Sequence, residues 1–510
     1  MRIAVCNRYW ATAGGGESYA LAIAGGLTRL GDVDLLGPPA VDWDLLHERL
    51  RIRPDASIRE VDVLDPSAVA AASRDYDLFV NVSWAASFVS LARHSVLVVH
   101  FPFRIVERET GRVRRTLVAA AAGTGMATRD GAVTYGDGFH APEGGADPYR
   151  WTDGDAELLL WLPPRDTRVE VVFGGGRPSP TTARVLVDGA ERVSATVGTE
   201  GGVVAAFDLR GRPDGLPHRV RVLSDSFHPA EVLGGGDDRR VGVAVRDVRV
   251  SSSVLGRLIR GTGVARAAQR ASWLSSYDLL LANSAYTARW VRRWWGRRAR
   301  VVHPAVVPRP RGAKELMILS VGRFFPPERG HSKRQLEMVR TFRGLVGRGL
   351  RGWQLHLVGG CQPEDRPYLA AVEREAEGLP VHIHLDASGD VLDDLYGRAA
   401  VYWHTAGMGE DVRTDPERVE HFGIAPLEAM SAGAVPIVPP VGGPAETVRD
   451  GTDGYHVRTF DELAERTAAL ARDPELLARV SQAAGRRARE YGPEAFAARL
   501  ERVVARLVRP

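Results

Sequence analysis

Short apolar runs alternate with stretches of helical character over the first hundred residues. The first run, residues 2–6, is followed by a glycine-rich loop and by a helical stretch over residues 18–30. Strands that alternate with helices in this way predict a parallel, doubly wound sheet. The further apolar runs of this region are residues 33–36, 58–63, 78–82 and 95–101.

The pattern changes after Phe103. Between residues 131 and 252, turns rich in Gly, Pro and Asp separate runs in which apolar and polar positions alternate. A period of two is that of a strand with one buried face. Repeated strands with turns at short intervals predict an all-β sandwich or jelly roll.

The α/β pattern then returns with residues 277–306, so the predicted sandwich interrupts the N-terminal domain. A stretch rich in Pro and Arg, residues 307–313, suits a linker between domains. Beyond it we expect a second doubly wound sheet. Its strands are predicted within residues 315–321, 353–360, 381–387, 401–407 and 435–443.

The predicted fold class is therefore α/β, with two Rossmann-like domains and an all-β insertion in the first. We expect the N-terminal domain to comprise residues 1–103 and 255–308. The insertion would comprise residues 131–252 and the C-terminal domain residues 309–492. A chain of 510 residues exceeds what one core supports and suggests about three domains.

Composition narrows the function only slightly. A hydrophobic content of 44% and a charged content of 25% are typical of a soluble globular protein. No apolar run approaches the roughly 18 residues of a membrane span, and Met1 leads directly into a strand without a signal peptide, so we expect a cytoplasmic protein. The net charge of +4 is compatible with anionic substrates and does not imply nucleic acid. Cys6 and Cys361 lie in separate halves, so no disulfide framework and no Cys-based metal site is expected.

Residues 420–433, EHFGIAPLEAMSAG, concentrate the candidate chemistry. Glu420 and Glu428 are eight positions apart, and a helix start lies between them because Pro426 suits a first helical turn. The backbone N–H groups of residues 422–424 would then face the cleft together with the positive end of the helix dipole. A sugar diphosphate suits such a site, since phosphates take backbone donors while sugar and ribose hydroxyls take carboxylate acceptors.

A glycine-rich turn follows the first predicted strand. Gly14, Gly15 and Gly16 would let the backbone approach a phosphate or a sugar closely. The turn is not a dinucleotide-binding fingerprint, because Tyr19 stands where the third glycine would be. A plain tight turn is the alternative.

The run EHFGIAPLEAMSAG, with the Gly-Gly-x-x-Glu turn that ends at Glu446, resembles the retaining glycosyltransferases of family four, which have the two-domain GT-B architecture. The resemblance extends to the loop GGGE, to YDLFVNVS, SVLVVHFPF and the helix that begins NSAYT, and only the insertion lies outside it. It implies that a helix over residues 493–510 crosses back to the N-terminal domain. An acidic, solvated helix end is the alternative interpretation of the two glutamates.

The resemblance implies a role for each matching residue. Glu420 would hold hydroxyls of the donor sugar, and Glu428 would hold those of the nucleotide ribose. His100, just past the carboxyl end of a strand, would line the sugar end of the donor site, and a histidine with only a packing role is the alternative. The remaining donor-binding positions are Gly15, Gly16, Phe422, Gly423 and Ile424.

Members of the family carry a basic pair just after the strand that opens the second domain. Arg323 and Lys333 are the candidates here for binding the diphosphate, and neutralising the departing charge lowers the barrier to transfer. Their separation of ten positions is wider than usual, so Arg329 and Arg334 remain alternatives to the lysine. With this fixed positive charge we expect no metal and no cofactor. A solvated basic loop without a binding role is the alternative interpretation of these residues.

The resemblance thus implies a metal-independent, retaining glycosyltransferase of polysaccharide biosynthesis that uses a nucleotide sugar and a glycan or lipid-linked acceptor. The EHFGI form is most like mannosyl-transferring relatives, which makes GDP-mannose the first donor to test. A nucleotide-sugar epimerase and a non-catalytic carbohydrate-binding protein stay open as alternatives.

Two further surfaces carry hypotheses about partners. The segment with Trp290, Trp294 and Trp295 among arginines predicts either peripheral contact with the anionic inner face of the membrane or a core-facing tryptophan stripe. The insertion leaves the first domain soon after Phe103, so we expect it beside the mouth of the cleft, where it would hold a growing glycan. A scaffold or an oligomer contact is the alternative role. Its candidate sugar-binding aromatic residues are Tyr135, Phe139, Tyr149, Trp151 and Phe227.

Overall fold

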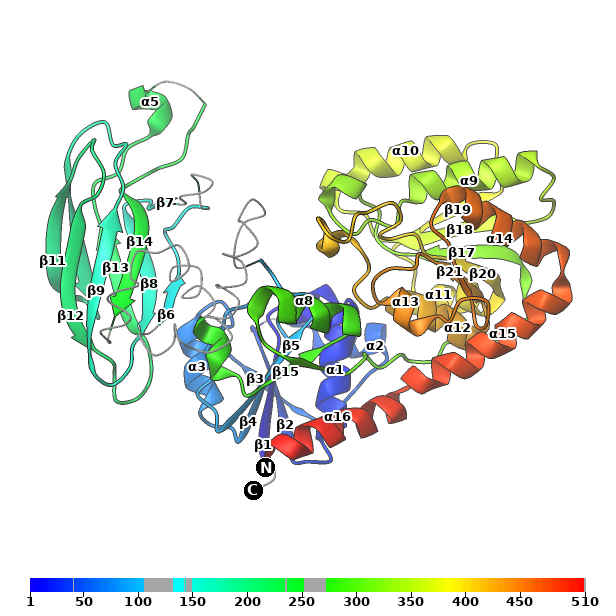
Figure 1. Cartoon of the computed structure of the whole chain (residues 1–510), viewed down its shortest axis with the longest axis horizontal. Helices are drawn as coiled ribbons and strands as arrows, with labels where there is room; N and C mark the ends of the chain where they lie inside the picture. Colours follow the sequence, from blue (N-terminus) through cyan, green and yellow to red (C-terminus); the bar gives the residue numbers. More distant parts are fainter. Residues whose placement is uncertain are drawn as a thin grey trace.

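A computed structural model (Figure 1) describes residues 1–39, 41–104, 132–141, 143, 149–233, 236–251 and 272–508. The positions at which we place the ends of the insertion, 131 and 252, and the return to the first domain, 255, lie outside the described residues.

The N-terminal domain is built on a seven-stranded parallel sheet of order β16-β15-β5-β4-β1-β2-β3. This is a doubly wound order, and it reverses between β1 and β4, where such sheets place ligands beyond the carboxyl ends of the strands. The strands are β1 (Arg2–Cys6), β2 (Asp32–Gly37), β3 (Ser57–Glu60), β4 (Leu78–Asn81), β5 (His94–Val99), β15 (Leu279–Ala282) and β16 (Ala299–Val301).

Both faces of this sheet are covered, which explains the unbroken apolar runs of its strands. Ile3 and Val5 of β1 face one core, and Ala4 and Cys6 face the other. The helices are α1 (Gly15–Leu27), α2 (Trp43–Leu50), α3 (Pro66–Ser73), α8 (Ala285–Trp295) and, from the end of the chain, α16 (Pro493–Val508). Phe496 of α16 belongs to the same core as Ile3 and Val5, and Figure 1 shows α16 running back along α1.

The C-terminal domain repeats this plan with a six-stranded parallel sheet of order β19-β18-β17-β20-β21-β22. The prediction of two doubly wound domains is therefore confirmed. The strands are β17 (Glu315–Val321), β18 (Gln354–Gly359), β19 (Val381–Leu385), β20 (Ala399–Trp403), β21 (Val435–Val438) and β22 (Tyr455–His456). The helices are α9 (Gln335–Gly347), α10 (Arg366–Ala376), α11 (Gly389–Arg398), α12 (Ile424–Ala432), α13 (Pro444–Thr447), α14 (Phe460–Arg472) and α15 (Pro474–Ala488).

Two antiparallel sheets lie between β5 and β15 in the sequence, and their strand orders are β11-β10-β13-β8-β6 and β12-β9-β14-β7. Val220 of one sheet and Val171 of the other belong to one hydrophobic core, so the sheets form a sandwich. Its strands are β6 (Ala132–Tyr135), β7 (Arg150–Trp151), β8 (Asp155–Trp161), β9 (Asp166–Phe173), β10 (Thr181–Val187), β11 (Ala190–Val197), β12 (Val204–Arg210), β13 (His218–Leu223) and β14 (Ala244–Ser251), with the short helix α5 (Pro229–Leu233).

The sandwich is an insertion in the first sheet, because β5 and β15 are hydrogen-bonded neighbours on either side of it in the sequence. It packs on α3, where Trp161 meets Ala70 and Arg219 forms an ion pair of 2.6 Å with Asp65. In Figure 1 this contact lies on the side of the first domain away from the second. We expected the sandwich beside the mouth of the cleft, but its point of departure after Phe103 does not determine where it docks, since long connecting segments precede and follow it.

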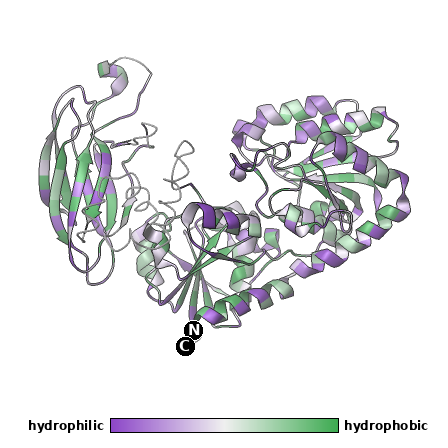
Figure 2. Ribbon diagram, viewed as in Figure 1, coloured by the Kyte–Doolittle hydropathy of each residue, from purple (hydrophilic) through white to green (hydrophobic). Residues whose placement is uncertain are grey.

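We propose the division of the chain into the four parts predicted above. The separate hydrophobic cores of the two parallel sheets and of the sandwich support it. Figure 2 shows hydrophobic residues gathered in the strands of both parallel sheets, with hydrophilic residues on the helices around them.

The tryptophans of α8 face inward. Trp290 and Trp295 are buried, and Trp294 packs edge-on against Phe101 with Arg104 over its ring. This favours the core-facing interpretation of the stripe. Among the described helices, none combines the length and the apolar character needed to span a bilayer.

Candidate functional site

The predicted helix start in residues 420–433 is confirmed. The helix α12 begins at Ile424, two residues before Pro426, and Gly423 before it has a φ of 86°, a conformation that glycine adopts without strain. Glu420 therefore lies in the loop and Glu428 on the helix. Within the described part of the chain, the N–H groups of Phe422 and Gly423 donate to no acceptor, so they are available to an anion.

A turn from the next motif holds this loop in place. Gly443 donates its N–H to the carbonyl oxygen of Glu420 at 2.9 Å. A Cβ on Gly442 would overlap that carbonyl, and a Cβ on Gly443 would overlap the backbone of Phe422. The two backbones approach closely enough that only glycine fits at both positions.

Lys333 meets Glu420, with its Nζ in contact with the Oε2 of that carboxylate. The residues between Arg323 and Lys333 form a closed loop, in which the hydroxyl of Ser332 donates to the carbonyl oxygen of Phe325 at 2.6 Å. The stem of Lys333 then lies across Gly322, where a Cβ would lie 2.6 Å from the Cγ of the lysine. The wide spacing is thus bridged by a folded loop, and the structure brings the lysine to Glu420.

The two alternatives to this lysine are engaged elsewhere. Arg329 forms ion pairs with Asp365 at 2.6 Å and with Glu364 at 3.3 Å, and Arg334 forms one with Glu410 at 2.5 Å.

Arg323 lies two residues after the end of β17 and is exposed. It lies over the ring of Phe325, 5.6 Å from the centroid, and forms no ion pair with any described residue. Its positive charge also helps to lower the pKa of the nearby His331, although burial lowers that pKa most. Arg323 is therefore a free cation next to the Lys333–Glu420 pair.

Neutral histidines surround this pair. His404 lies just beyond β20, and its Nε2 is 3.7 Å from the Oε2 of Glu420. Burial, and then the Lys333 ammonium, lower the pKa of His404 to about 3. Burial also lowers the pKa of His421 to about 3. Burial acts to raise the pKa of Glu420, but Lys333 outweighs it and holds the pKa below its ordinary value. At neutral pH the site thus combines one carboxylate, two cations and uncharged imidazoles.

His100 is held in a defined orientation at the end of β5. Its Nε2 is 2.8 Å from the carbonyl oxygen of Val82, so this nitrogen carries the proton and Nδ1 is left as an acceptor. Its own carbonyl oxygen accepts from Asn283 Nδ2 at 3.0 Å and from Thr287 Oγ1 at 3.1 Å. Burial lowers the pKa of the imidazole, so at neutral pH the ring is uncharged.

The glycine-rich segment, where α1 begins at Gly15, reaches the second domain. A Cβ on Gly15 would lie 3.2 Å from the Cδ1 of Ile424, and one on Gly16 would lie 3.6 Å from the ring of His100. Glu17 holds the turn, since its carboxylate accepts from the N–H of Gly14 at 2.9 Å. The predicted residues Gly15, Gly16, His100 and Ile424 are therefore neighbours across the domain boundary.

Two further contacts tie the domains together at this site. The ring of His421 stacks on Phe101, with centroids 4.1 Å apart and planes 7° apart. Glu446 accepts from the backbone N–H groups of Ala285 and Tyr286 at 2.8 and 2.6 Å, at the start of α8. The carboxylate thereby sits at the positive end of a helix in the other domain.

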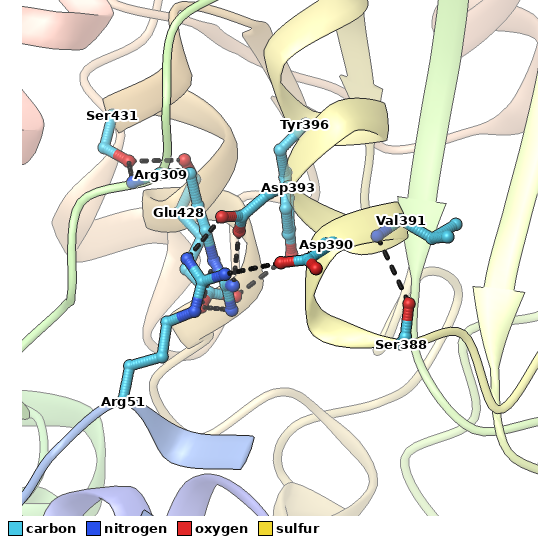
Figure 3. Close-up of polar contacts among 9 residues, drawn as sticks. All are labelled: Arg51, Arg309, Ser388, Asp390, Val391, Asp393, Tyr396, Glu428 and Ser431. Atoms are coloured by element: carbon cyan, nitrogen blue, oxygen red, sulfur yellow. Dashed lines mark hydrogen bonds and ion pairs between the residues drawn. The ribbon is translucent and has the colours of Figure 1, made fainter. Parts of the chain in front are cut away.

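Glu428 lies apart from the Lys333–Glu420 pair and has protein partners of its own. Arg309 and Tyr396 both bind its carboxylate, as Figure 3 shows. Sequence reasoning missed Arg309 and Tyr396, and it also missed His404. The only signal for His404 is its place just past the carboxyl end of a predicted strand. No local pattern distinguishes Arg309 from the other arginines of the linker.

The chain was compared with known proteins. A family model described as glycosyl transferases group 1 matches residues 308–487. The GDP-Man:Man(3)GlcNAc(2)-PP-Dol alpha-1,2-mannosyltransferase of Dictyostelium discoideum is 29% identical over 212 residues, which are 37% of this chain and 39% of that protein. The sucrose synthase of Acidithiobacillus caldus is 28% identical over 169 residues, 31% of this chain and 21% of that protein.

Solved structures extend the likeness to the whole fold. The Anabaena HepE complex with UDP-glucose superposes with a TM-score of 0.53 over 99% of this chain and 100% of that one, at 13% identity. That identity supports the shared fold alone. The chain spans well under half the length of the two curated relatives named above.

Proposed function

We propose, from the premise that residues 308–487 form a glycosyltransferase group 1 domain, that the whole chain is a retaining, metal-independent glycosyltransferase. It transfers a sugar from a nucleoside diphosphate to a hydroxyl of a glycan or a lipid-linked acceptor. The observation that carries this proposal is the arrangement around Glu420: Lys333 contacts its carboxylate, the free Arg323 precedes that lysine in the same loop, and the unpaired N–H groups of Phe422 and Gly423 follow Glu420 in the chain.

This arrangement suits the departure of a diphosphate. The bond between the anomeric carbon and the diphosphate oxygen breaks, and the two cations together with the free N–H groups stabilise the negative charge that develops on the phosphates. The acceptor oxygen bonds to the anomeric carbon on the face that the diphosphate leaves, and its proton passes to the departing phosphate. Glu420 orients the sugar through its hydroxyls, and the Nδ1 of His100 accepts a hydrogen bond from the same sugar.

Domain contact completes the site. Gly15 lies beside Ile424, and His421 stacks on Phe101, so the donor would be enclosed between the two domains. Exclusion of water allows transfer to outrun hydrolysis of the donor.

The donor is proposed from the relatives. The mannosyltransferase relative is named for GDP-mannose, and the HepE structure holds UDP-glucose. GDP-mannose is therefore the first donor to test, with UDP-glucose as the second.

We propose a cytoplasmic location. Peripheral membrane contact rests on Arg292 and Arg293, which stay exposed on α8.

The test is a donor panel with and without a glycan acceptor, in the presence of a chelator. Wild type should transfer sugar with chelator present, and Lys333→Ala should lower turnover by about 10²-fold, the scale of losing one charge-stabilising group. Arg329→Ala is the matched control, because Arg329 lies in the same loop but pairs with Asp365. A strict requirement for added divalent metal would contradict the proposed mechanism. Donor conversion without an acceptor would instead indicate an epimerase, and donor binding without turnover a carbohydrate-binding protein.

A further inference from the structure

The carboxylate of Glu428 is almost saturated by protein donors (Figure 3). Its Oε1 accepts from Arg309 twice, from Nε at 3.0 Å and from Nη2, and its Oε2 accepts from the hydroxyl of Tyr396 at 3.0 Å. An ionised carboxylate offers about four acceptor positions. Three are used, so one remains on Oε2 for a hydroxyl from outside the protein.

Arg309 is itself held from several directions. Its backbone N–H donates to the hydroxyl of Ser431 at 2.9 Å, and its Nη1 donates to Asp393 at 2.9 Å. Its guanidinium lies over the ring of Tyr396, 5.3 Å from the centroid. The side chains of Arg309, Asp393 and Glu428 are only 12–14% exposed, so removing one charge would leave its partners buried without compensation. The direction in which Glu428 points is thus set by Arg309.

The same cluster joins three parts of the chain. Arg309 lies in the linker between β16 and β17, while Asp393 of α11 and Glu428 of α12 belong to the second domain. Arg51 follows α2 of the first domain and contacts Asp393 as well, with Asp390 3.7 Å away. Figure 3 shows Arg51 reaching these carboxylates from a different element than Arg309 does.

We propose that Arg309 is a positioning residue, which orients the last free acceptor position of Glu428 toward a ribose hydroxyl of the donor nucleotide. Through Arg51, this orientation of Glu428 depends on contact between the domains. The proposal rests on the proposed function, because it needs a nucleotide donor. Opening of the domains would remove Arg51 from Asp393, and Arg309 would then be drawn more strongly toward Asp393 and away from Glu428.

The first experiment measures binding of GDP and UDP and of their 2′,3′-dideoxy analogues by calorimetry. Wild type should bind one ribonucleotide about tenfold or more tighter than its dideoxy analogue, the scale of a charge-assisted hydrogen bond. Arg309→Lys should reduce that ratio to below about threefold, because an ammonium cannot bind Glu428 with two nitrogens. Arg311→Lys is the matched control in the same linker, since Arg311 is exposed, and it should keep the wild-type ratio.

A second variant tests the same role in case the Arg309→Lys protein does not fold. Tyr396→Phe removes one hydroxyl from Glu428 while keeping the buried ring, and it should also lower the ratio. Unchanged ratios in both variants, or equal weakening of both nucleotide forms, would overturn the positioning role. If wild type binds a nucleotide and its dideoxy analogue equally well, the positioning role is overturned too, while the proposed function stays intact. Wild type that binds neither GDP nor UDP would overturn the proposed function itself and the inference with it.

The role of Arg51 is tested with one variant and a matched control. Arg51→Ala should lower transfer efficiency by about two- to fivefold at low salt and less at high salt, because the side chain of Arg51 is 34% exposed. Arg53→Ala should have no effect, since among the described residues Arg53 forms an ion pair only with the exposed Asp44 of its own domain, at 2.5 Å. Equal activities of the two variants would overturn the link to domain contact.

Discussion

At the scale of single residues, the site is governed by which groups stay charged. Burial holds His404 and His421 neutral with pKa values of about 3, whereas Lys333 keeps Glu420 ionised. In the unfolded chain the same imidazoles have pKa values near 6.5. Between the two pKa values the unfolded state binds more protons than the folded state. The stability that the neutral imidazoles contribute is therefore complete above about pH 6.5 and is lost as the pH falls toward 3.

We therefore expect the melting temperature to fall between about pH 7.5 and pH 5. His404→Asn should reduce the slope of the free energy of unfolding against pH by up to about 1.4 kcal/mol per pH unit, which is the effect of binding one proton. The measurement is a series of thermal melts across the pH range. His228→Asn is the control, because His228 is exposed on the sandwich. If wild type and His404→Asn lose stability with the same slope, His404 does not stay neutral in the folded protein.

At the scale of elements, the backbone at the start of α12 depends on two segments that pack without side chains between them. The turn at Gly442 and Gly443 lies directly on the loop from Glu420 to Phe422. That close approach fixes the loop that leads into α12, and with it the free N–H groups of Phe422 and Gly423. A shift of the loop by about 1 Å is enough to cost about 10²-fold in rate.

Gly443→Ala should displace this loop and lower transfer by about that factor, while the protein remains folded. Nucleoside diphosphate affinity and turnover are the two readouts, and circular dichroism reports the fold. The control is Gly347→Ala at the end of α9, where an added Cβ meets nothing within 4 Å. Activity of Gly443→Ala at the level of this control would show that the backbone donors do not bind the diphosphate.

At the scale of the whole molecule, two parallel sheets of the same strand order present the ends of their strands to one another. Gly15 lies beside Ile424, Glu446 binds the start of α8, and α16 returns to the first domain. The sandwich takes no part in these contacts. Its described contacts with the first domain are at α3 and at Leu91 before β5, through Trp161, Leu216 and Arg219.

Replacing residues 131–252 by a short flexible linker should therefore leave nucleotide affinity and donor hydrolysis nearly unchanged. Transfer to a long natural acceptor should weaken more than transfer to a short analogue, if the aromatic rings of the sandwich hold a glycan. Of these rings, Tyr149, Trp151 and Phe227 form an edge-to-face cluster at half-buried positions. Equal loss for both acceptors in a folded protein would contradict a role of the sandwich in acceptor binding.

The sequence by itself determined the elements and the segments that carry the chemistry. Apolar runs and turn residues act locally, so most strands of both parallel sheets, the alternating strands of the sandwich and the helix start before Pro426 are readable from short windows. The strand β22 was not predicted, because two residues are too few to show a periodicity. The glycines at 15, 16, 423, 442 and 443 could be assigned for the same reason, since each marks a turn or a close approach.

Only the tertiary structure decided which side chains meet. Lys333 reaches Glu420 across 87 positions and Arg309 reaches Glu428 across 119, and neither separation has a local signature. His404 is kept neutral by burial, which no window of sequence displays. The docking of the sandwich on α3 likewise depends on the surfaces of two folded units. Local patterns determine backbone conformation because turns and periodicity act over a few residues, whereas contacts between distant side chains exist only once the sheets have assembled.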